Sequence, residues 1–304
     1  MSLNETTQPA ETFAAPANWQ AYLALCKPKV VLLIAFTAIV GMLLASPGIP
    51  DLRLLFLSLA GISLTAASGA AINHWMDRRI DEKMARTHNR PLPQGEITPS
   101  RALGFALLLG VLGLGLLAAQ VNTLTTVLTA LSLIGYAVIY TVYLKHATPY
   151  NIVWGGAAGA TPPLLGWAAM TGQVGAEAIV LFAIIFLWTP PHFWALAIRR
   201  REDYARAGVP MLPVTHGIAF TKRQIVLYTA VLIVATLVPF AIGMSGPLYL
   251  TAALVLGLGF MRHVLRLLRG DDNAQAMATF KYSVQYLMWL FAAFLLDHVS
   301  TQVL

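Results

Sequence analysis

The sequence predicts an all-α polytopic membrane protein with nine membrane-spanning helices. Of the 304 residues, 58% are hydrophobic and only 11% are charged, and the mean hydropathy is +0.69, whereas a soluble domain carries about 25% charged residues. Predominantly apolar stretches of bilayer length, about 17–25 residues, recur along the chain. Most of the charged residues fall in alternate connections. Together these observations exclude a soluble globular domain and indicate a bundle of transmembrane helices.

The predicted spans lie between a short N-terminal tail and the C-terminus. Residues 1–18 contain neither Lys nor Arg and so lack the basic region of a signal peptide. We expect a disordered cytoplasmic tail there, followed by a single domain over residues 19–304. Each span is an apolar run bounded by charged or Gly- and Pro-containing segments, which interrupt helices. The nine spans cover residues 29–46, 53–75, 100–120, 123–144, 149–170, 176–197, 224–244, 246–268 and 279–299.

The distribution of Lys and Arg predicts the orientation in the lipid bilayer. With nine spans, 19 of the 20 basic residues fall on one side, and only Arg53 falls on the other. Because basic residues near span ends stay in the cytoplasm, we expect a cytoplasmic N-terminus and an external C-terminus. Topology therefore accounts for the net charge of +7. Basic and aromatic residues are not interleaved as they are in nucleic-acid-binding surfaces, so no nucleic acid is expected as a partner.

Two predicted cytoplasmic connections, about 76–99 and 198–223, are long and charged, and they resemble each other. Asp81 precedes "ARTHNRPLPQG", and Asp203 precedes "ARAGVPMLPVTHG". This short match suggests two related halves that would bring both connections over one central cavity. Small residues cluster at 65–71 and 155–163. They indicate closely packed transmembrane helices or, alternatively, a slim backbone that admits a bulky ligand.

Asn73, Asp77 and Asp81 are spaced at i, i+4 and i+8, so a helix that continues out of the second span would place them on one face. Two carboxylates and an amide oxygen without Cys or His suit Mg²⁺, which completes its coordination shell with water and substrate phosphates. The alternative is that the carboxylates only pair with neighbouring basic residues. Those neighbours are Arg78, Arg79 and Lys83.

The second connection contains a similar group. His192, Arg199 and Asp203 have spacings of seven and four, which again predict one helical face, and Glu202 stands beside Asp203. Carboxylates that hold Mg²⁺ and cations that hold phosphate oxygens together make a diphosphate site. This inference rests on the paired acidic residues, because the cytoplasmic location of the connection already explains many of the basic residues. Those basic residues are Arg86, Arg90, Lys145, Arg199, Arg200, Arg201 and Arg206.

A diphosphate site at the mouth of an apolar bundle predicts a substrate with a charged head and an apolar tail, such as an isoprenyl diphosphate. Mg²⁺ and cationic side chains would stabilise the departing diphosphate as the allylic C–O bond breaks. Aromatic faces could stabilise the allylic cation, although each aromatic residue could instead serve packing. The aromatic residues considered are Tyr136, Tyr140, Tyr143, Trp154 and Trp194.

Three segments resemble the signature regions of one family. They are "NHWMDRRIDEKMARTHNRPLP", "YTVYLKHATPYNIVWGGAAGATPPLLGW" and "TPPHFWALAIRRREDYARAGVPMLPV". The chain is similar over residues 20–300 to the protohaem IX farnesyltransferases, or haem O synthases, of the UbiA-type intramembrane prenyltransferase superfamily. The resemblance implies nine helices around a central cavity, with capping helices in the 2–3 and 6–7 connections. It also implies farnesyl transfer from farnesyl diphosphate to a vinyl group of haem B, with addition of water, which gives haem O.

The resemblance also assigns roles to individual residues. Asn73, Asp77 and Asp81 correspond to the first Mg²⁺–diphosphate motif, and Asp203 is the expected acid of the second. Histidine is the commonest protein ligand of haem iron, so His192 and, after it, His74 are the candidates for haem binding; the alternative is that neighbouring Arg or Asp side chains satisfy His192. We expect Asn73, Asp77, Asp81 and Asp203 to be catalytic. The metal ligands among them are Asp77, Asp81 and Asp203, the last either alone or with Glu202. The diphosphate-binding candidates are Arg86, Arg90, Lys145, Arg199 and Arg206.

The resemblance further implies a location and partners. The expected location is the bacterial inner membrane, with the active site facing the cytoplasm. Haem O would go to a haem-copper oxidase or a haem A synthase, so these are the expected protein partners. The segment "RRREDY" has arginines where quinone-type prenyltransferases carry more acids, which argues against a quinone precursor as acceptor. A quinone-type enzyme and a carrier of haem or lipid diphosphate are the alternatives. The predicted spans lack the relay of ionisable groups across the bilayer that marks ion-coupled transporters, so the carrier is the surviving form of a transport function.

Overall fold

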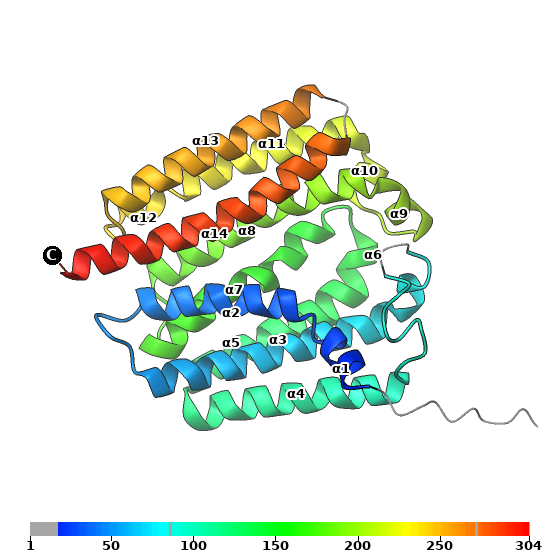
Figure 1. Ribbon diagram of the computed structural model, residues 1–304, viewed down its shortest axis with the longest axis horizontal. Coiled ribbons are helices and arrows are strands. Elements are labelled where there is room, and N and C mark those ends of the chain that lie inside the picture. Colours follow the sequence, from blue (N-terminus) through cyan, green and yellow to red (C-terminus); the bar gives the residue numbers. More distant parts are fainter. Residues whose placement is uncertain (1–17, 85–86, 271–272, 304) are drawn as a thin grey trace, which may run out of the picture.

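The computed structural model describes residues 18–84, 87–270 and 273–303, and they form a bundle of long helices joined by turns and short helices (Figure 1). Arg86 and residues 1–17 of the predicted tail lie outside the described residues. All nine predicted spans fall on helical segments. The all-helical fold class is therefore confirmed.

The N-terminal half begins with a bent pair of helices. Helix α1 meets α2 at an angle of 51°, and α3 returns along α2. Asp51, Thr98 and Asn122 accept hydrogen bonds from first-turn amides, so each caps the start of a helix. The elements are α1 (Trp19–Leu25), α2 (Pro28–Leu44), α3 (Leu52–Asp81), α4 (Pro99–Gln120), α5 (Thr123–Ile134), the π-helix η1 (Gly135–Leu144), α6 (Lys145–Ala147) and α7 (Asn151–Thr171).

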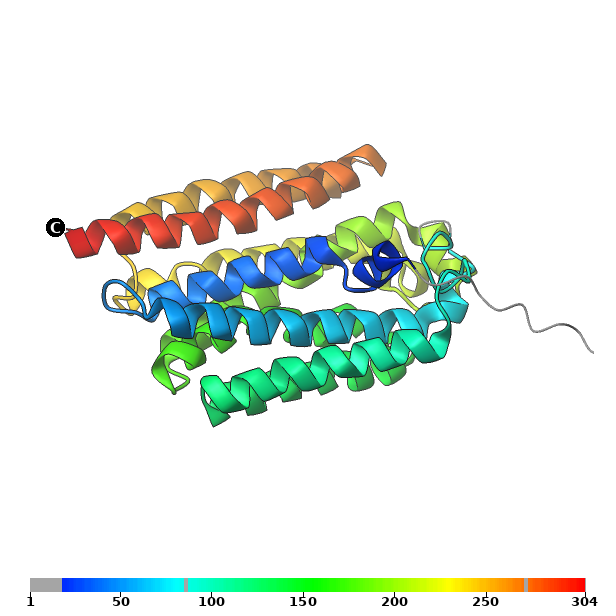
Figure 2. The same ribbon diagram turned by 60° about the horizontal axis from the view of Figure 1, so that its bottom comes forward.

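The C-terminal half is built around α8, which packs against α7, α11 and α14. The largest apolar core cluster lies here and joins residues of α2, α7, α8, α11, α13 and α14. Figure 2 shows α13 and α14 as a layer on the outside of this half. The elements are α8 (Ala176–Arg199), α9 (Arg201–Arg206), α10 (Leu212–Thr215), α11 (Gly217–Ala235), α12 (Val238–Ala241), α13 (Pro247–Arg269) and α14 (Asn273–Val303).

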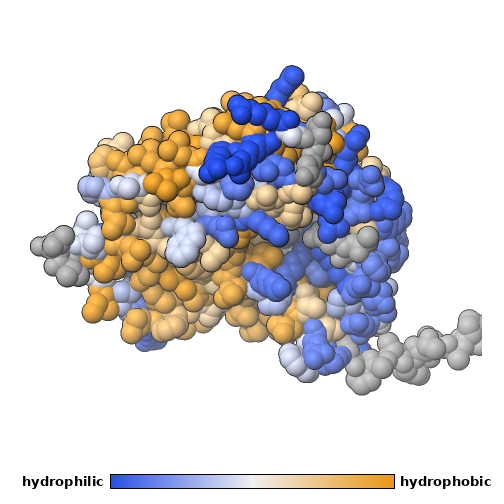
Figure 3. All heavy atoms as spheres, turned by 45° about the horizontal axis from the view of Figure 1, so that its top comes forward, coloured by the Kyte–Doolittle hydropathy of each residue, from blue (hydrophilic) through white to orange (hydrophobic). Residues whose placement is uncertain are grey.

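The bundle has the dimensions and surface of a multi-pass membrane protein. Among the described residues, six helices are long and apolar enough to cross a bilayer, and the bent pair α1–α2 is a seventh candidate. The count of nine spans therefore stays a prediction. Hydrophobic side chains cover most of the face in Figure 3, and hydrophilic ones gather towards one end. The connections predicted to be cytoplasmic meet at this end, near α6, α9 and α10 in Figure 1.

The two long connections differ in structure. The 6–7 connection contains the expected capping helices, α9 and α10. In the 2–3 connection the described residues 82–84 and 87–98 form turns instead of a helix, since Pro91 and Pro93 remove backbone donors that a helix would need. Gly95 and Gly217, which match in the two similar segments, both have a positive φ, at 71° and 79°.

Small residues let α2 and α7 approach each other closely. A Cβ on Gly166 of α7 would overlap the carbonyl oxygen of Ala38 in α2, and one on Gly41 would overlap that of Pro163. The prolines within α7 leave carbonyls without helical donors, and the Thr161 hydroxyl donates to the Ala158 oxygen at 2.8 Å. Within the predicted cluster at 155–163, a Cβ on Gly156 would lie 2.8 Å from the Thr189 side chain, whereas one on Gly159 would meet nothing within 4 Å. Close packing therefore accounts for part of the predicted clusters.

We predict that Gly166→Ala destabilises the protein, because the added Cβ must push α2 away from α7; overpacking of this kind costs about 1–3 kcal/mol. Gly159→Ala, on the same helix, is the matched control, since its Cβ meets nothing within 4 Å. Thermal unfolding of the purified protein in detergent should show a lower midpoint for Gly166→Ala only. Equal midpoints for the two variants would contradict the close contact.

Candidate functional site

The predicted stripe of oxygen ligands lies on one continuous helix. Asn73, Asp77 and Asp81 occupy the last turns of α3, and their side chains are buried, at 6%, 5% and 3% exposure. The Asn73 amide donates to Asp77 Oδ2 at 2.8 Å, which is the i, i+4 contact that the spacing predicts. The stripe faces the interior of the bundle, where an uncompensated carboxylate would be costly.

Each buried carboxylate of the stripe has a cationic partner from another part of the chain. Lys145 Nζ lies 2.6 Å from Asp77 Oδ1, and Arg90 Nη1 lies 2.7 Å from Asp81 Oδ2. The Thr87 hydroxyl also donates to the Asp81 carbonyl at 3.1 Å and ties the turn that carries Arg90 to the end of α3. The neighbours Arg78 and Arg79 make no ion pair with either carboxylate among the described residues. The site is thus assembled by tertiary structure.

The π-helix η1 positions the side of the site opposite α3. Thr141 Oγ1 lies 3.4 Å from the Asn73 amide nitrogen and donates to the Tyr136 carbonyl at 2.8 Å. Tyr136 and Tyr140 stack with ring centroids 5.8 Å apart. Long π-helical segments are rare and occur often at functional sites. The sequence analysis predicted an ordinary span here and so missed this feature.

Lys27 is a site residue that the sequence analysis missed. Its Nζ donates to Asn73 Oδ1 at 2.5 Å, so it adds a third cation to the stripe. Lys27 has a φ of 49° and is the one non-glycine residue with positive φ in the described part of the chain. This conformation is costly for a side chain with a Cβ and tends to occur at functional sites. The sequence pattern that could have indicated this role is a basic residue directly before Pro28, at the start of the first predicted span.

The second acidic group lies at the same end of the bundle. Asp203 is buried and pairs with Arg206 at 2.5 Å and with Arg200 at 3.3 Å. The hydrogen bond from Arg206 lowers the pKa of Asp203 below its ordinary value. Tyr204 of α9 and Ile80 of α3 pack against the same small apolar cluster, so this cluster joins the two acidic segments.

The predicted helical face through His192, Arg199 and Asp203 is wrong. Helix α8 ends at Arg199, and the backbone of Arg200, with φ −107° and ψ 20°, separates it from α9. The break leaves Arg199 exposed, and Arg200 pairs with Asp203 instead. Glu202 is also exposed, so Asp203 is the buried acid of this segment.

His192 is held tightly between α8 and α14. Its ring stacks between Trp188 and Phe280, with centroid distances of 4.2 and 4.5 Å. Its Nδ1 lies 2.7 Å from the Ser283 hydroxyl, and that hydroxyl donates to the Phe280 carbonyl at 2.6 Å. Because the Ser283 proton is used in this way, the network assigns the donor hydrogen to Nδ1, which leaves a lone pair on Nε2.

His74 has a different environment. It is 4% exposed, and neither ring nitrogen has a hydrogen-bond partner. Buried polar atoms normally have hydrogen-bond partners, so the two ring nitrogens of His74 are exceptions to this rule.

The predicted aromatic residues differ in their distance from the stripe. Trp194 is fully buried against Tyr228, with ring centroids 5.3 Å apart. That position fits a role in packing, whereas Tyr136 and Tyr140 adjoin the stripe.

The donors present fit Mg²⁺ bound together with a phosphate ligand. No cluster of three or more His, Cys, Asp or Glu side chains that could hold a metal occurs in the described residues. Mg²⁺ does not need such a cluster, because it is commonly held by one or two carboxylates, water and substrate phosphates. Asp77 and Asp81 with the Asn73 amide oxygen supply such a set, and the cations beside them suit phosphate oxygens. The arrangement can therefore bind a diphosphate.

Comparison with known proteins identifies the family. The model of the UbiA prenyltransferase family matches residues 34–293. The chain is 60% identical to protoheme IX farnesyltransferase of Thioalkalivibrio sulfidiphilus, over 92% of this chain and 93% of that protein. It is 57% identical to protoheme IX farnesyltransferase of Methylococcus capsulatus, over 98% and 99% of the two chains.

Solved structures share the fold at low sequence identity. A structure of digeranylgeranylglyceryl phosphate synthase superposes with a TM-score of 0.79 at 21% identity, over 93% of this chain and 99% of that one. A UbiA homologue from Archaeoglobus fulgidus, bound to DMAPP and Mg²⁺, gives a TM-score of 0.60 at 18% identity, over 90% and 99%. The helical architecture is therefore shared across these membrane proteins.

We predict that the Asp77–Lys145 pair contributes to stability through direct coupling. Lys145→Met should lower the unfolding midpoint by about 5 °C, because it leaves a buried carboxylate without its partner. The double variant Asp77→Asn/Lys145→Met should lose less than the sum of the two single variants. Arg53→Met, which removes an exposed hydrogen bond to Gln120, is the control and should change little. Additive single effects at Asp77 and Lys145 would contradict the pairing.

Proposed function

The chain belongs to the UbiA prenyltransferase family, and we propose that it transfers a farnesyl group from farnesyl diphosphate to a vinyl group of protohaem IX (haem B), giving haem O and diphosphate. The acceptor is inferred from relatives with 57–60% identity over nearly the whole chain. The structural observation that carries the proposal is the pair of buried acid–base contacts, Asp77–Lys145 and Asp81–Arg90, at one end of an apolar bundle.

The cations of the site would hold the diphosphate head. Arg90 presents a planar fork that suits phosphate oxygens, and Lys145 and Lys27 present point charges. They lie around α3, so the apolar tail of the substrate would extend among the helices. Arg206 of the second segment is a further candidate. Arg86 and the exposed Arg199 stay predictions, the first because it lies outside the described residues.

The reaction breaks the allylic C–O bond of farnesyl diphosphate, and the bonding electron pair leaves with diphosphate. The vinyl group of haem supplies the electrons for the new C–C bond, water adds to the remaining carbon, and its proton is released to diphosphate. Cations fixed around the leaving group stabilise its developing charge without reorganisation. The stacked pair Tyr136–Tyr140 can stabilise the allylic cation through the ring faces.

Mg²⁺ is the proposed metal of this site. Asp77 and Asp81 would hold it, with Asn73 beside them and Asp203 from the second segment. When bound, Mg²⁺ would neutralise part of the diphosphate charge and make it a better leaving group. The same residues would meanwhile exclude bulk water, because all four side chains are buried.

His192 is the proposed haem ligand. The Ser283 hydroxyl fixes the ring so that its Nε2 carries the lone pair, and a neutral imidazole nitrogen oriented by a second partner is the usual histidine ligand. Trp188 and Phe280 hold the plane of the ring. His74 is the second candidate, since its nitrogens lack partners.

The proposed location is the bacterial inner membrane, with the site on the cytoplasmic side. The connections that carry the basic residues meet at the site end of the bundle, which supports this orientation. Haem O would pass to a haem-copper oxidase or a haem A synthase. A quinone precursor as acceptor and a carrier function are not favoured, because the highly similar relatives are named for farnesyl transfer to protohaem.

We predict Mg²⁺-dependent turnover that requires both acids of α3. Purified protein given haem B and farnesyl diphosphate should form a haem product that carries farnesyl plus water, as read by mass spectrometry, and EDTA should abolish it. Asp77→Asn and Asp81→Asn should each reduce the rate by about 100-fold or more. Asp51→Asn, at the opposite end of α3, is the control. Full activity in either acid variant would refute the assignment.

We also predict that His192→Ala weakens haem binding and spares binding of farnesyl diphosphate. The haem absorption spectrum should shift, because the nitrogen ligand is lost. His263→Ala is the matched control, since His263 stacks on Tyr282 of α14 at 4.6 Å and belongs to no proposed site. An unchanged spectrum in His192→Ala would assign this histidine to packing.

A further inference from the structure

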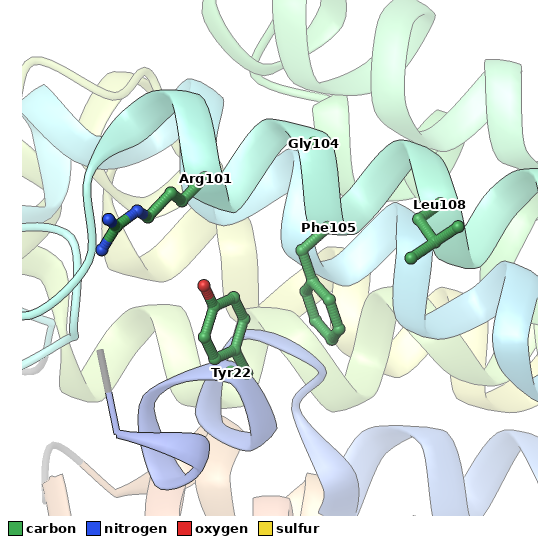
Figure 4. A pocket seen from close by; sticks show the side chains of 5 residues that line it. All are labelled: Tyr22, Arg101, Gly104, Phe105 and Leu108. Carbon is green, nitrogen blue, oxygen red and sulfur yellow. The ribbon is translucent and has the colours of Figure 1, made fainter. Parts of the chain in front are cut away.

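A pocket between α1 and α4 lies outside the proposed catalytic site. Its volume is about 430 Å³, and it is lined by Tyr22, Arg101, Gly104, Phe105 and Leu108 (Figure 4). Tyr22 packs edge-on against Phe105, with ring centroids 4.9 Å apart. Figure 4 shows the Arg101 side chain and the Tyr22 hydroxyl at one end of this pocket, with Phe105 and Leu108 further along α4. The pocket is therefore polar at one end and apolar along its length.

Arg101 is one of the basic residues that the predicted topology places on the cytoplasmic side, but topology alone specifies no partner for its guanidinium. It lies in the first turn of α4, where the helix dipole disfavours a cation and where no acidic residue is present. None of the ion pairs formed by the described residues involves it. An exposed guanidinium and a phenol hydroxyl that line the same end of the pocket can both donate to the oxygens of a phosphate group. The charged end of the pocket therefore suits an anion.

The surroundings of the pocket place its head at the membrane surface. Trp19 and Leu23 on α1 are 68% and 46% exposed, and Trp side chains favour the interface between lipid and water. Beyond the pocket, α4 exposes Val111 and Leu112, which are 70% and 52% exposed and lie on the same helical face as Leu108. An apolar chain that starts at Arg101 would therefore run along α4 into the hydrocarbon region.

We propose that this pocket binds one phospholipid with an acidic headgroup. Arg101 and the Tyr22 hydroxyl would contact the headgroup phosphate, and an acyl chain would lie over Phe105 and Leu108. Acidic headgroups carry the net negative charge that complements the guanidinium. The site is separate from the diphosphate site and does not depend on the proposed reaction. A lipid there would also fix α1, and Lys27, two residues beyond the end of this helix, contacts Asn73.

The test measures retained lipid directly. Protein purified in detergent is exposed to phosphatidylglycerol or phosphatidylcholine, and bound lipid is counted by native mass spectrometry. The wild type should retain one phosphatidylglycerol in preference to phosphatidylcholine. Arg101→Gln should reduce that preference on the order of tenfold, because a charge-assisted hydrogen bond is lost. Arg262→Gln, an exposed arginine on α13, is the charge control and should retain the preference.

A second variant blocks the pocket without touching the charge. A Cβ at Gly104 meets nothing within 4 Å, so Gly104→Leu should fold and fill the space over Phe105. Gly115→Leu, on the same helix and equally unobstructed, is the control. Loss of the bound lipid in Gly104→Leu alone supports the site. Unchanged retention in both Gly104→Leu and Arg101→Gln would overturn it, whatever the outcome of the farnesyl transfer assay.

Discussion

The site depends on one requirement, that two carboxylates buried at the end of α3 must each be neutralised. Burial of an unpaired charge in a low-dielectric interior costs several kcal/mol, so Asp77 and Asp81 require cations from outside their own helix. Lys145 and Arg90 meet this requirement from 68 and 9 residues away. The ion pairs bring α6 and the 2–3 connection onto α3. The proposed substrate-binding cations and the proposed metal ligands therefore lie in contact before any ligand arrives.

Much of this fold could be predicted from the sequence, because its determinants are local. Apolar runs of bilayer length mark the helices, and the i, i+4, i+8 spacing placed Asn73, Asp77 and Asp81 on one face of α3. The alternation of basic connections also predicted that they meet at one end of the bundle. Each of these inferences uses periodicity or composition within a short window. Hydrophobic periodicity within a short stretch of sequence is enough to predict that a helix is present.

The partners of the site could not be predicted in the same way. A helical spacing of four predicted that Arg199 and Asp203 share one face, but the backbone break at Arg200 separates them. The arginines that pair with Asp203 are Arg200 and Arg206. The π-helical stretch around Tyr140 needs hydrogen bonds that no residue pattern specifies. Lys27 reaches Asn73 only because its backbone adopts a left-handed conformation between α1 and α2. These features depend on tertiary contacts.

The backbone at Lys27 also makes the bend between α1 and α2 a rigid corner. The left-handed region available to a residue with a Cβ is small, so the angle between the two helices cannot vary as freely as it could at a glycine. The residue that fixes this corner is also the one whose ammonium group donates to Asn73. The path of the chain into the first span and the position of one cation at the proposed site are therefore set by the same residue.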